Sequence, residues 1–222
     1  MRVLLSPGES ELARALRDGL TGHETAIDVA PEIDAESGAR TVGARFDAVV
    51  WAGLPDGDPD GPADPSAVLD RSTRLAYDLL NAAAEAGVGR CVYLSSLRLL
   101  AGYGEHHTVT EGWRPLPPSD DPALIGCHLG EQIALEFARE RRMEVVTVRL
   151  GYPVVPGSRS TLRDAHGDAA ICADDVAAVV SAALMAPVAQ ACTVVHAQSP
   201  VANARYLMRQ ATELLGYPEA PA

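Results

Sequence analysis

The chain has 222 residues, of which 47% are hydrophobic and only 5% aromatic, so we expect one ordinary domain with a large aliphatic core. Its 18 basic and 30 acidic residues give a formal net charge of −12, and such a surface repels nucleic-acid phosphates and anionic lipid. We therefore expect neither nucleic acid nor a membrane as a partner. The four cysteines are widely spaced, which favours reduced thiols and a cytoplasmic protein.

Apolar runs alternate with segments of helical periodicity along most of the chain. In chain order we expect strand 2–5, helix 12–20, strands 25–30 and 46–53, a Pro/Gly/Asp loop at 54–66, helix 67–87, strand 90–96, an irregular segment 97–121, helix 122–142 and strand 143–151. This alternation, with continuous Val, Ile and Leu in the strands, predicts an α/β fold. The expected architecture is a doubly wound parallel Rossmann-type sheet with helices on both faces.

The last part of the chain has a different pattern. Two predicted helices, 174–187 and 203–216, flank a short strand at 193–197. We therefore expect a Rossmann-type domain over residues 1–155. A small C-terminal subdomain over residues 156–222 is expected beside the sheet, on the substrate side.

Several motifs follow one another in the order and spacing of a known family. They are FDAVVWAG (46–53), LLNAAAEAGVGRCVYLSS (79–96), VTEGWRPLPPSDDP (109–122), GEQ (130–132), VVTVRLG (145–151), ICADDVAAVVSAAL (171–184) and ELLGYP (213–218). Together they resemble the NAD-dependent epimerase/dehydratase branch of the extended short-chain dehydrogenase/reductase superfamily. The resemblance covers nearly the whole chain. It implies the Rossmann-type fold, an NAD(P) cofactor and a small-molecule substrate.

The resemblance also implies a catalytic triad, and this chain departs from it. The family has a tyrosine and, four residues later, a lysine on the helix that precedes GEQ, and a serine after the preceding strand. Counting from Gly130, those positions hold Ala123 and Cys127, and the serine position holds Leu97. In the family the tyrosine transfers a proton, the lysine lowers its pKa and the serine polarises the carbonyl. We therefore predict that the standard triad is lost.

The connection after the first strand is a further departure. The family has TGxxGxxG here, whereas this chain has SPGESE (6–11), about four residues shorter and with one glycine. This stretch fits a capping box with Ser6 as N-cap, Pro7 at the first helical position and Glu9 at the third. Its carboxylates would oppose a pyrophosphate. The alternative is a short loop that still reaches one phosphate.

We therefore expect no cofactor, or weakly bound NAD(P). If NAD(P) binds, the candidate contacts are Ser6, Gly8, Ser10, Asp28 and Gly53. Asp28 precedes the usual position of the ribose-binding acid and Glu32 follows it, so Asp28 could equally be a polar residue on the strand face.

Other groups could replace the lost chemistry. The candidate acid/base and substrate-contact residues are Tyr103, His106, His107, Glu111, His128, Ser95 and Ser96. The alternatives are an exposed polar loop at 103–114, a surface histidine at 128 and hydrogen bonding at the end of the strand for the two serines. Adjacent histidines on a loop seldom bind one ion, so we expect no metal site.

Three functions stay open. The first is an enzyme that acts on a small metabolite by redox-neutral or altered acid/base chemistry, in bacterial specialised metabolism. The second is a noncatalytic binding or partner subunit. The third is an NAD(P)-dependent oxidoreductase with displaced catalytic residues. The resemblance further implies a homodimer formed through helices 67–87 and 122–142.

Overall fold

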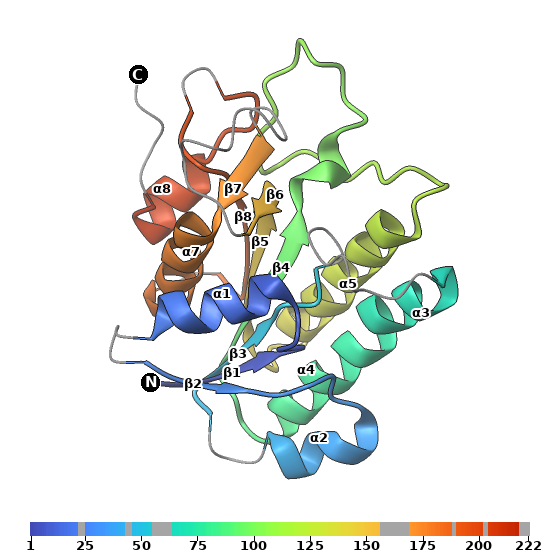
Figure 1. Ribbon diagram of the computed structural model, residues 1–222, viewed down its shortest axis with the longest axis vertical. Helices are drawn as coiled ribbons and strands as arrows, with labels where there is room; N and C mark the ends of the chain where they lie inside the picture. The colour runs from blue at the N-terminus through green and yellow to red at the C-terminus, as the bar shows by residue number, and fades with distance from the viewer. Residues whose placement is uncertain are drawn as a thin grey trace.

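The computed structural model describes residues 1–21, 25–42, 46–54, 64–155, 169–187, 190–201 and 204–217. Most of the loop expected at 54–66 lies outside these ranges. Six parallel strands form the main sheet in the order β2-β1-β3-β4-β5-β8 (Figure 1). These strands are β1 (Arg2–Ser6), β2 (Ala26–Val29), β3 (Ala48–Trp51), β4 (Arg90–Ser96), β5 (Glu144–Leu150) and β8 (Cys192–Ala197). A second, two-stranded sheet pairs β6 (Tyr152–Val154) with β7 (Ala170–Cys172).

Helices cover both faces of the main sheet, so the predicted doubly wound α/β fold is confirmed (Figure 1). One face carries α1 (Glu11–Leu20) and α7 (Ala173–Met185), with α8 (Arg209–Leu215) beside β8. The other face carries α2 (Ala35–Thr41), α3 (Pro65–Asp70), α4 (Ala76–Glu85) and α5 (Pro122–Arg139). A π-helical turn, Arg71–Leu75, joins α3 to α4, and a 3-10 turn, Leu97–Leu100, follows β4.

Alternating side chains of the buried strands build two cores. In β1, Val3 and Leu5 belong to the apolar cluster that includes α1 and α7, whereas Leu4 belongs to the cluster that includes α4 and α5. This follows from the strand geometry, because successive side chains point to opposite faces of a sheet. The continuous apolar strands seen in the sequence are therefore buried on both sides.

Helix α5 lies very close to β4 and is held by a buried ion pair. A Cβ atom on Gly130 would lie 1.8 Å from the Tyr93 hydroxyl oxygen, so only glycine permits this approach. One residue on, the Glu131 carboxylate accepts two hydrogen bonds of 2.9 Å from Arg149 of β5. Their side chains are 5% and 6% exposed. Close packing and a paired buried charge together fix α5 on the sheet.

The C-terminal part of the chain requires one correction. The strand expected beside the sheet is β8, which pairs in parallel with β5 and is the sixth strand of the main sheet. Helix α7 packs against α1 at the other end of the chain. The small sheet of β6 and β7 and the bridge between Val109 and Tyr206 lie outside the main sheet. The division at residue 155 stays a prediction.

The described sheet has one strand beyond β1, namely β2. The usual dinucleotide-binding order, 3-2-1-4-5-6, has two strands there. Only α2 lies between β2 and β3 among the described residues. At the edge strand, Val29 is 41% exposed. The described sheet is therefore narrower on its β2 side than that order.

Among the described residues, no helix is long and apolar enough to cross a membrane. The predicted dimer helices carry two large exposed apolar side chains, Tyr77 on α4 and Leu129 on α5. The homodimer and the cytoplasmic location stay predictions.

Glu131→Gln leaves the Arg149 guanidinium buried without its counter-charge, so we expect the free energy of unfolding to fall by about 3–5 kcal/mol in urea denaturation. The matched control is Glu136→Gln on the same helix, because Glu136 and its partner Arg139 are 57% and 63% exposed. The control should cost less than about 1 kcal/mol. Equal losses in the two variants would contradict a clamping role for the buried pair.

Candidate functional site

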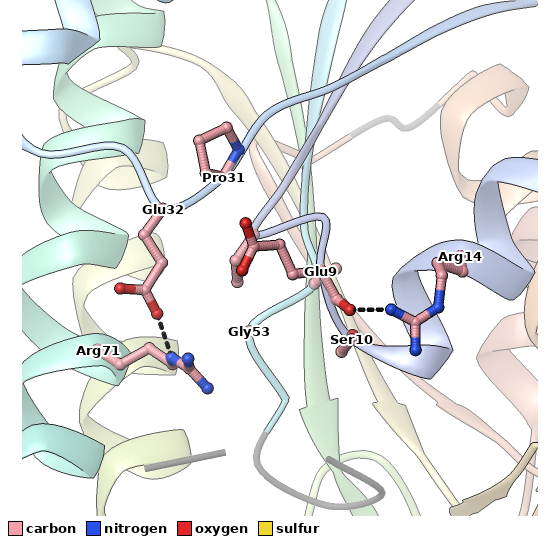
Figure 2. Close-up of a pocket in the computed structure, with 9 residues that line it drawn as sticks. Glu9, Ser10, Arg14, Pro31, Glu32, Gly53 and Arg71 are labelled. Carbon is pink, nitrogen blue, oxygen red and sulfur yellow. Dashed lines mark hydrogen bonds and ion pairs between the residues drawn. The ribbon is translucent and has the colours of Figure 1, made fainter. Parts of the chain in front are cut away.

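A cavity of about 680 Å³ opens at the carboxyl ends of β1, β2 and β3. The strand order reverses between β1 and β3, because β2 lies on one side of β1 and β3 on the other. Ligands of open α/β sheets bind at such a reversal point. The lining residues are Pro7, Glu9, Ser10, Arg14, Pro31, Glu32, Ala52, Gly53 and Arg71 (Figure 2).

The connection from β1 to α1 differs from the expected capping box. Ser6 is the last residue of β1, pairs with Trp51 of β3, and donates a hydrogen bond of 2.7 Å to the Pro31 carbonyl oxygen. Ser10 is the N-cap of α1, and its hydroxyl oxygen accepts a 3.1 Å bond from the Ala13 amide. The capping box at Ser6 is therefore wrong, because strand pairing extends through Ser6 and the helix begins only at Glu11.

The predicted cofactor contacts divide into residues that line the cavity and residues that do not. Ser10 and Gly53 line it. Gly8 instead presses against β2, because a Cβ atom there would lie 2.0 Å from Cγ1 of Val29. The close packing of Gly8 against β2 therefore explains why this position requires a glycine. Asp28 forms an ion pair with Arg2 away from the cavity, and both side chains are 46% exposed.

Two arginines that sequence reasoning missed line the cavity and offset the charge of its two carboxylates, Glu9 and Glu32. Arg14, on α1, donates a hydrogen bond to the Glu9 carbonyl oxygen, and Arg71 pairs with Glu32 on the other side of the cavity (Figure 2). The acidic loop therefore does not make the site uniformly negative. Arg14 could have been found as a cation near the start of the helix after the first strand. Arg71 could not, because only the folded chain brings it to Glu32.

Apolar side chains cover the carboxyl ends of the strands on the other side of the reversal point. Five members of the α1/α7 core cluster lie at or just after the ends of β3, β4 and β5 or near the start of α5, each 3% exposed or less: Leu54, Leu99, Leu124, Cys127 and Leu150. Cys127 is thus a core residue. A cation at its position would have to be buried in an apolar cluster, at a large desolvation cost.

Near the carboxyl ends of β4, β5 and β8, three buried polar residues lie side by side on the face of the sheet that packs against α5. Ser95 pairs in register with Arg149, and Arg149 with His196, so the three side chains share one face at one level. The Ser95 hydroxyl and both ring nitrogens of His196 have no hydrogen-bond partner among the described residues. The neighbouring Ser96 accepts a 3.2 Å bond from the Arg98 amide and so caps a turn.

Burial shapes the chemistry of His196. Burial lowers the pKa of His196 from 6.5 to about 3, mainly through desolvation and then through the positive charge of Arg149. The Leu207 backbone raises this pKa by a smaller amount. Its ring packs edge-on against Tyr206, with centroids 6.3 Å apart. His196 is therefore neutral near pH 7, and its unpartnered nitrogens are enclosed within the fold.

The polar segment 103–114 is a folded loop with an aromatic cluster. Tyr103 and Trp113 meet edge to face at 4.5 Å between ring centroids, and the rings of His106 and His107 lie 4.1 Å apart. His107 also lies 5.7 Å from Trp113. Both histidines are exposed. The Tyr103 hydroxyl donates to the Arg114 carbonyl oxygen at 2.9 Å.

Glu111 and His128 do not join this cluster. The Glu111 carboxylate accepts a 2.8 Å bond from the Gln210 amide in the first turn of α8, so it caps that helix. It lines a second cavity, of about 550 Å³, with residues of α8 and Thr193. His128 lies on α5, where its Nδ1 is buried without a hydrogen-bond partner in the part of the chain that the structure describes. The predicted acid/base residues are therefore spread over three places. No three His, Cys, Asp or Glu side chains in the described ranges gather as a metal site would require.

Comparison with known proteins places the chain. The model of the NAD dependent epimerase/dehydratase family matches residues 32–173, more than half of the sequence. The chain belongs to this family. No curated protein matches it in sequence.

Solved structures of the same fold agree with the family assignment. Uronate dehydrogenase from Agrobacterium tumefaciens has a TM-score of 0.78 at 20% identity, covering 99% of this chain and 84% of its own. UDP-N-acetylglucosamine 4-epimerase from Bacillus cereus has a TM-score of 0.75 at 16% identity, covering 100% and 94%. A UDP-glucuronic acid 4-epimerase from Bacillus cereus in complex with NAD has a TM-score of 0.74 at 13% sequence identity. The match covers 100% of this chain and 92% of the epimerase chain. At these identities the likeness shows the fold.

The family implies NAD, and the described residues fit only part of it. The β1–β2–β3 side offers a cavity with Arg14, Arg71 and the carboxylate of Glu32. A dinucleotide would also extend across the reversal point to β4 and β5. There the described side chains are the closely packed apolar cluster that contains Leu124 and Cys127.

The buried His196 predicts a pH-dependent stability. Its folded-state pKa lies below the unfolded value, so the unfolded chain binds the extra proton and stability falls as pH drops from 6.5 towards 3. Between about pH 7 and about pH 5, His196 should lower the free energy of unfolding by about 2 kcal/mol. In urea denaturation, His196→Asn should remove this part of the pH dependence. Gln198→Met, a nontitrating change at a buried polar residue just after β8, should retain it. An unchanged slope in His196→Asn would refute the assignment.

Proposed function

We propose that this chain binds a nucleotide-type small molecule at the carboxyl ends of β1, β2 and β3, without transferring hydride through the residues that its family ordinarily uses. The observation that carries the proposal is the placement of Cys127. It stands where the resemblance puts the lysine, yet it is 3% exposed within the apolar core. Ala123, at the tyrosine position, has no proton to give.

The cavity supports a ligand with phosphate and hydroxyl groups. Arg14 and Arg71 are guanidinium donors, which suit phosphate oxygens. Glu32 is a carboxylate acceptor, which suits ribose hydroxyls. Two solved structures with this fold, the UDP-glucuronic acid 4-epimerase and MoeE5, are in complex with NAD, and MoeE5 also with UDP-glucuronic acid. These ligands belong to the same chemical class.

The other polar groups of the fold support a structural role better than a catalytic one. The Arg149 guanidinium is occupied by Glu131, and both side chains are almost wholly buried. Ser95 is fully buried, and Ser96 caps a turn. A ligand in the cavity therefore meets no ordered proton donor and acceptor pair among the described residues. We keep the cytoplasmic location, a role in bacterial specialised metabolism and the homodimer through helices 67–87 and 122–142 as parts of this proposal.

The test is an assay for hydride transfer alongside an assay for binding. With NAD and glucuronic acid or UDP-glucuronic acid, we expect no absorbance of reduced nicotinamide, even when protein is stoichiometric with cofactor. The same protein should be thermally stabilised by added nucleotide, because a ligand that binds only the folded state raises its stability. Stoichiometric NADH formation would refute the proposal. So would the absence of stabilisation by any nucleotide.

A second candidate function is redox-neutral acid/base catalysis. The observation that favours it is the exposed pair His106 and His107, next to Tyr103 and Trp113 on one loop. Histidines titrate near neutral pH and are the commonest proton-transfer residues. Glu111 does not contribute to this group, because its carboxylate is bonded to α8.

Substitution of the histidine pair decides this candidate. Without added cofactor, the protein is incubated with UDP-N-acetylglucosamine, UDP-glucuronic acid and glucuronic acid, and products are separated by chromatography. Acid/base catalysis by the loop predicts a conversion that falls roughly 10²-fold or more in the double variant His106→Asn/His107→Asn. The exposed neighbour Glu105 supplies the control, Glu105→Gln, which should keep full conversion. If the double variant converts as fast as the wild type, the histidines are not catalytic.

A further inference from the structure

We infer that the cavity takes a mononucleotide, a nucleoside with one or two phosphates, in place of a whole dinucleotide. The inference rests on the proposed function, because it names the ligand of the same site. It departs from the cofactor that the family implies. Three observations support it: the cavity lies on one half of the carboxyl edge, apolar side chains occupy the other half among the described residues, and charged side chains line the cavity.

The cavity is confined to one half of the carboxyl edge. Its lining comes from the β1–α1 connection, the start of α1, the residues after β2, the residues after β3 and the π-helical turn that contains Arg71. None of the lining residues belongs to β4, β5 or α5. A dinucleotide is bound by two mononucleotide-binding halves of such a sheet, across the reversal point. The lining of this cavity corresponds to one half.

Among the described residues, the other half of the carboxyl edge is occupied by apolar side chains. Leu54 follows β3, Leu124 and Cys127 come from α5, and all three are 3% exposed or less in one apolar cluster. The same cluster continues into the packed core between the sheet and helices α1 and α7. A nicotinamide ring placed here would have to displace close-packed core side chains, which is costly.

The lining carries two guanidinium groups, on Arg14 and Arg71, and two carboxylates, on Glu9 and Glu32, and a phosphate would be held between the two guanidinium groups. Arg14 and Arg71 lie on opposite sides of the cavity, Arg14 from α1 and Arg71 from the turn between α3 and α4 (Figure 2). Each guanidinium can donate hydrogen bonds to phosphate oxygens in a planar fork. Arg14 also lies in the first turns of a ten-residue helix, whose N-terminus favours negative charge.

The ion pair between Glu32 and Arg71 can open to admit such a ligand. The two side chains are 39% and 24% exposed, so the pair is partly in water and contributes little stability by itself. A ligand phosphate can compete with Glu32 for Arg71, and the Glu32 carboxylate can accept hydrogen bonds from the hydroxyl groups of a ribose. Pro7 and Pro31 add apolar lining against which a base can pack.

Isothermal titration of the wild-type protein with ADP, UDP, NAD and nicotinamide mononucleotide tests the inference. We expect ADP or UDP to bind at least as tightly as NAD, because the nicotinamide half gains no contacts. Nicotinamide mononucleotide should bind no more tightly than ADP or UDP. Arg14→Ala and Arg71→Ala should each weaken the tighter of ADP and UDP by about tenfold or more.

Two matched controls lie close by in the chain. Arg17→Ala removes an exposed arginine of α1 that pairs with Asp18, and Arg74→Ala removes one that pairs with Asp70 and Asp78. Neither residue lines the cavity. Both variants should bind the nucleotide as the wild type does. Circular dichroism of all four variants checks that the fold is kept. Arg14, Arg17 and Arg74 are exposed, so their substitution should not disturb the core.

The outcomes separate this inference from the proposed function. Binding of NAD at least tenfold tighter than ADP and UDP would overturn the mononucleotide inference and leave nucleotide binding in place. If none of the four compounds binds, the proposed function fails, and the inference fails with it. Equal losses in the cavity variants and their controls would show that binding occurs elsewhere, which would also overturn the inference.

Discussion

The close contact of helix α5 with β4 and β5 is the constraint on which the rest of the site depends. Gly130 lets the helix backbone approach Tyr93, and Glu131 then binds Arg149 in a buried ion pair. With the helix fixed at this depth, Leu124 and Cys127 face the carboxyl ends of the strands and join the core. The helix that carries proton-transfer residues in the family therefore acts here as part of the apolar packing.

The same depth of packing explains why the two halves of the carboxyl edge differ. On the β4–β5 side, apolar side chains from α5 close the surface, and the polar row of Ser95, Arg149 and His196 is buried behind them. On the β1–β3 side, the short connection after β1 turns inward to β2 through Gly8. This leaves a cavity between α1 and the turn that contains Arg71. The apolar packing around α5 and the polar cavity beside β1 are thus two results of one arrangement of the helices.

Much of the fold could be predicted from local pattern. The alternation of apolar strands and helices gave the parallel sheet, and counting from Gly130 located Ala123 and Cys127 on a helix that the structure contains. Periodicity located α1 to within one residue of its start, but the motif SPGE wrongly suggested a helix cap at Ser6, because pairing with β3 extends β1 through that residue. Local pattern also could not place β8 in the main sheet, since that pairing joins segments far apart in the chain.

The candidate site was harder to predict than the fold for the same reason. Glu111 and the two histidines are close in sequence, yet Glu111 turns towards α8 and the histidines face solvent. Conversely, Arg14 and Arg71 are far apart in sequence and meet only at the cavity. The motif around residues 6–11 predicts a reduced glycine-rich loop, and this stays a prediction. It could not show that two arginines supply positive charge in its place.

The central claim is that the protein binds one half of a dinucleotide and excludes the other from its packed core. Saturation-transfer difference NMR on NAD in the presence of the protein tests this most directly, since it reports which ligand protons touch the protein. We predict strong transfer to the protons of the adenine and its ribose and little to those of the nicotinamide ring. Equal transfer to both rings would contradict the claim, because it would require an open nicotinamide site among the side chains of α5, β4 and β5.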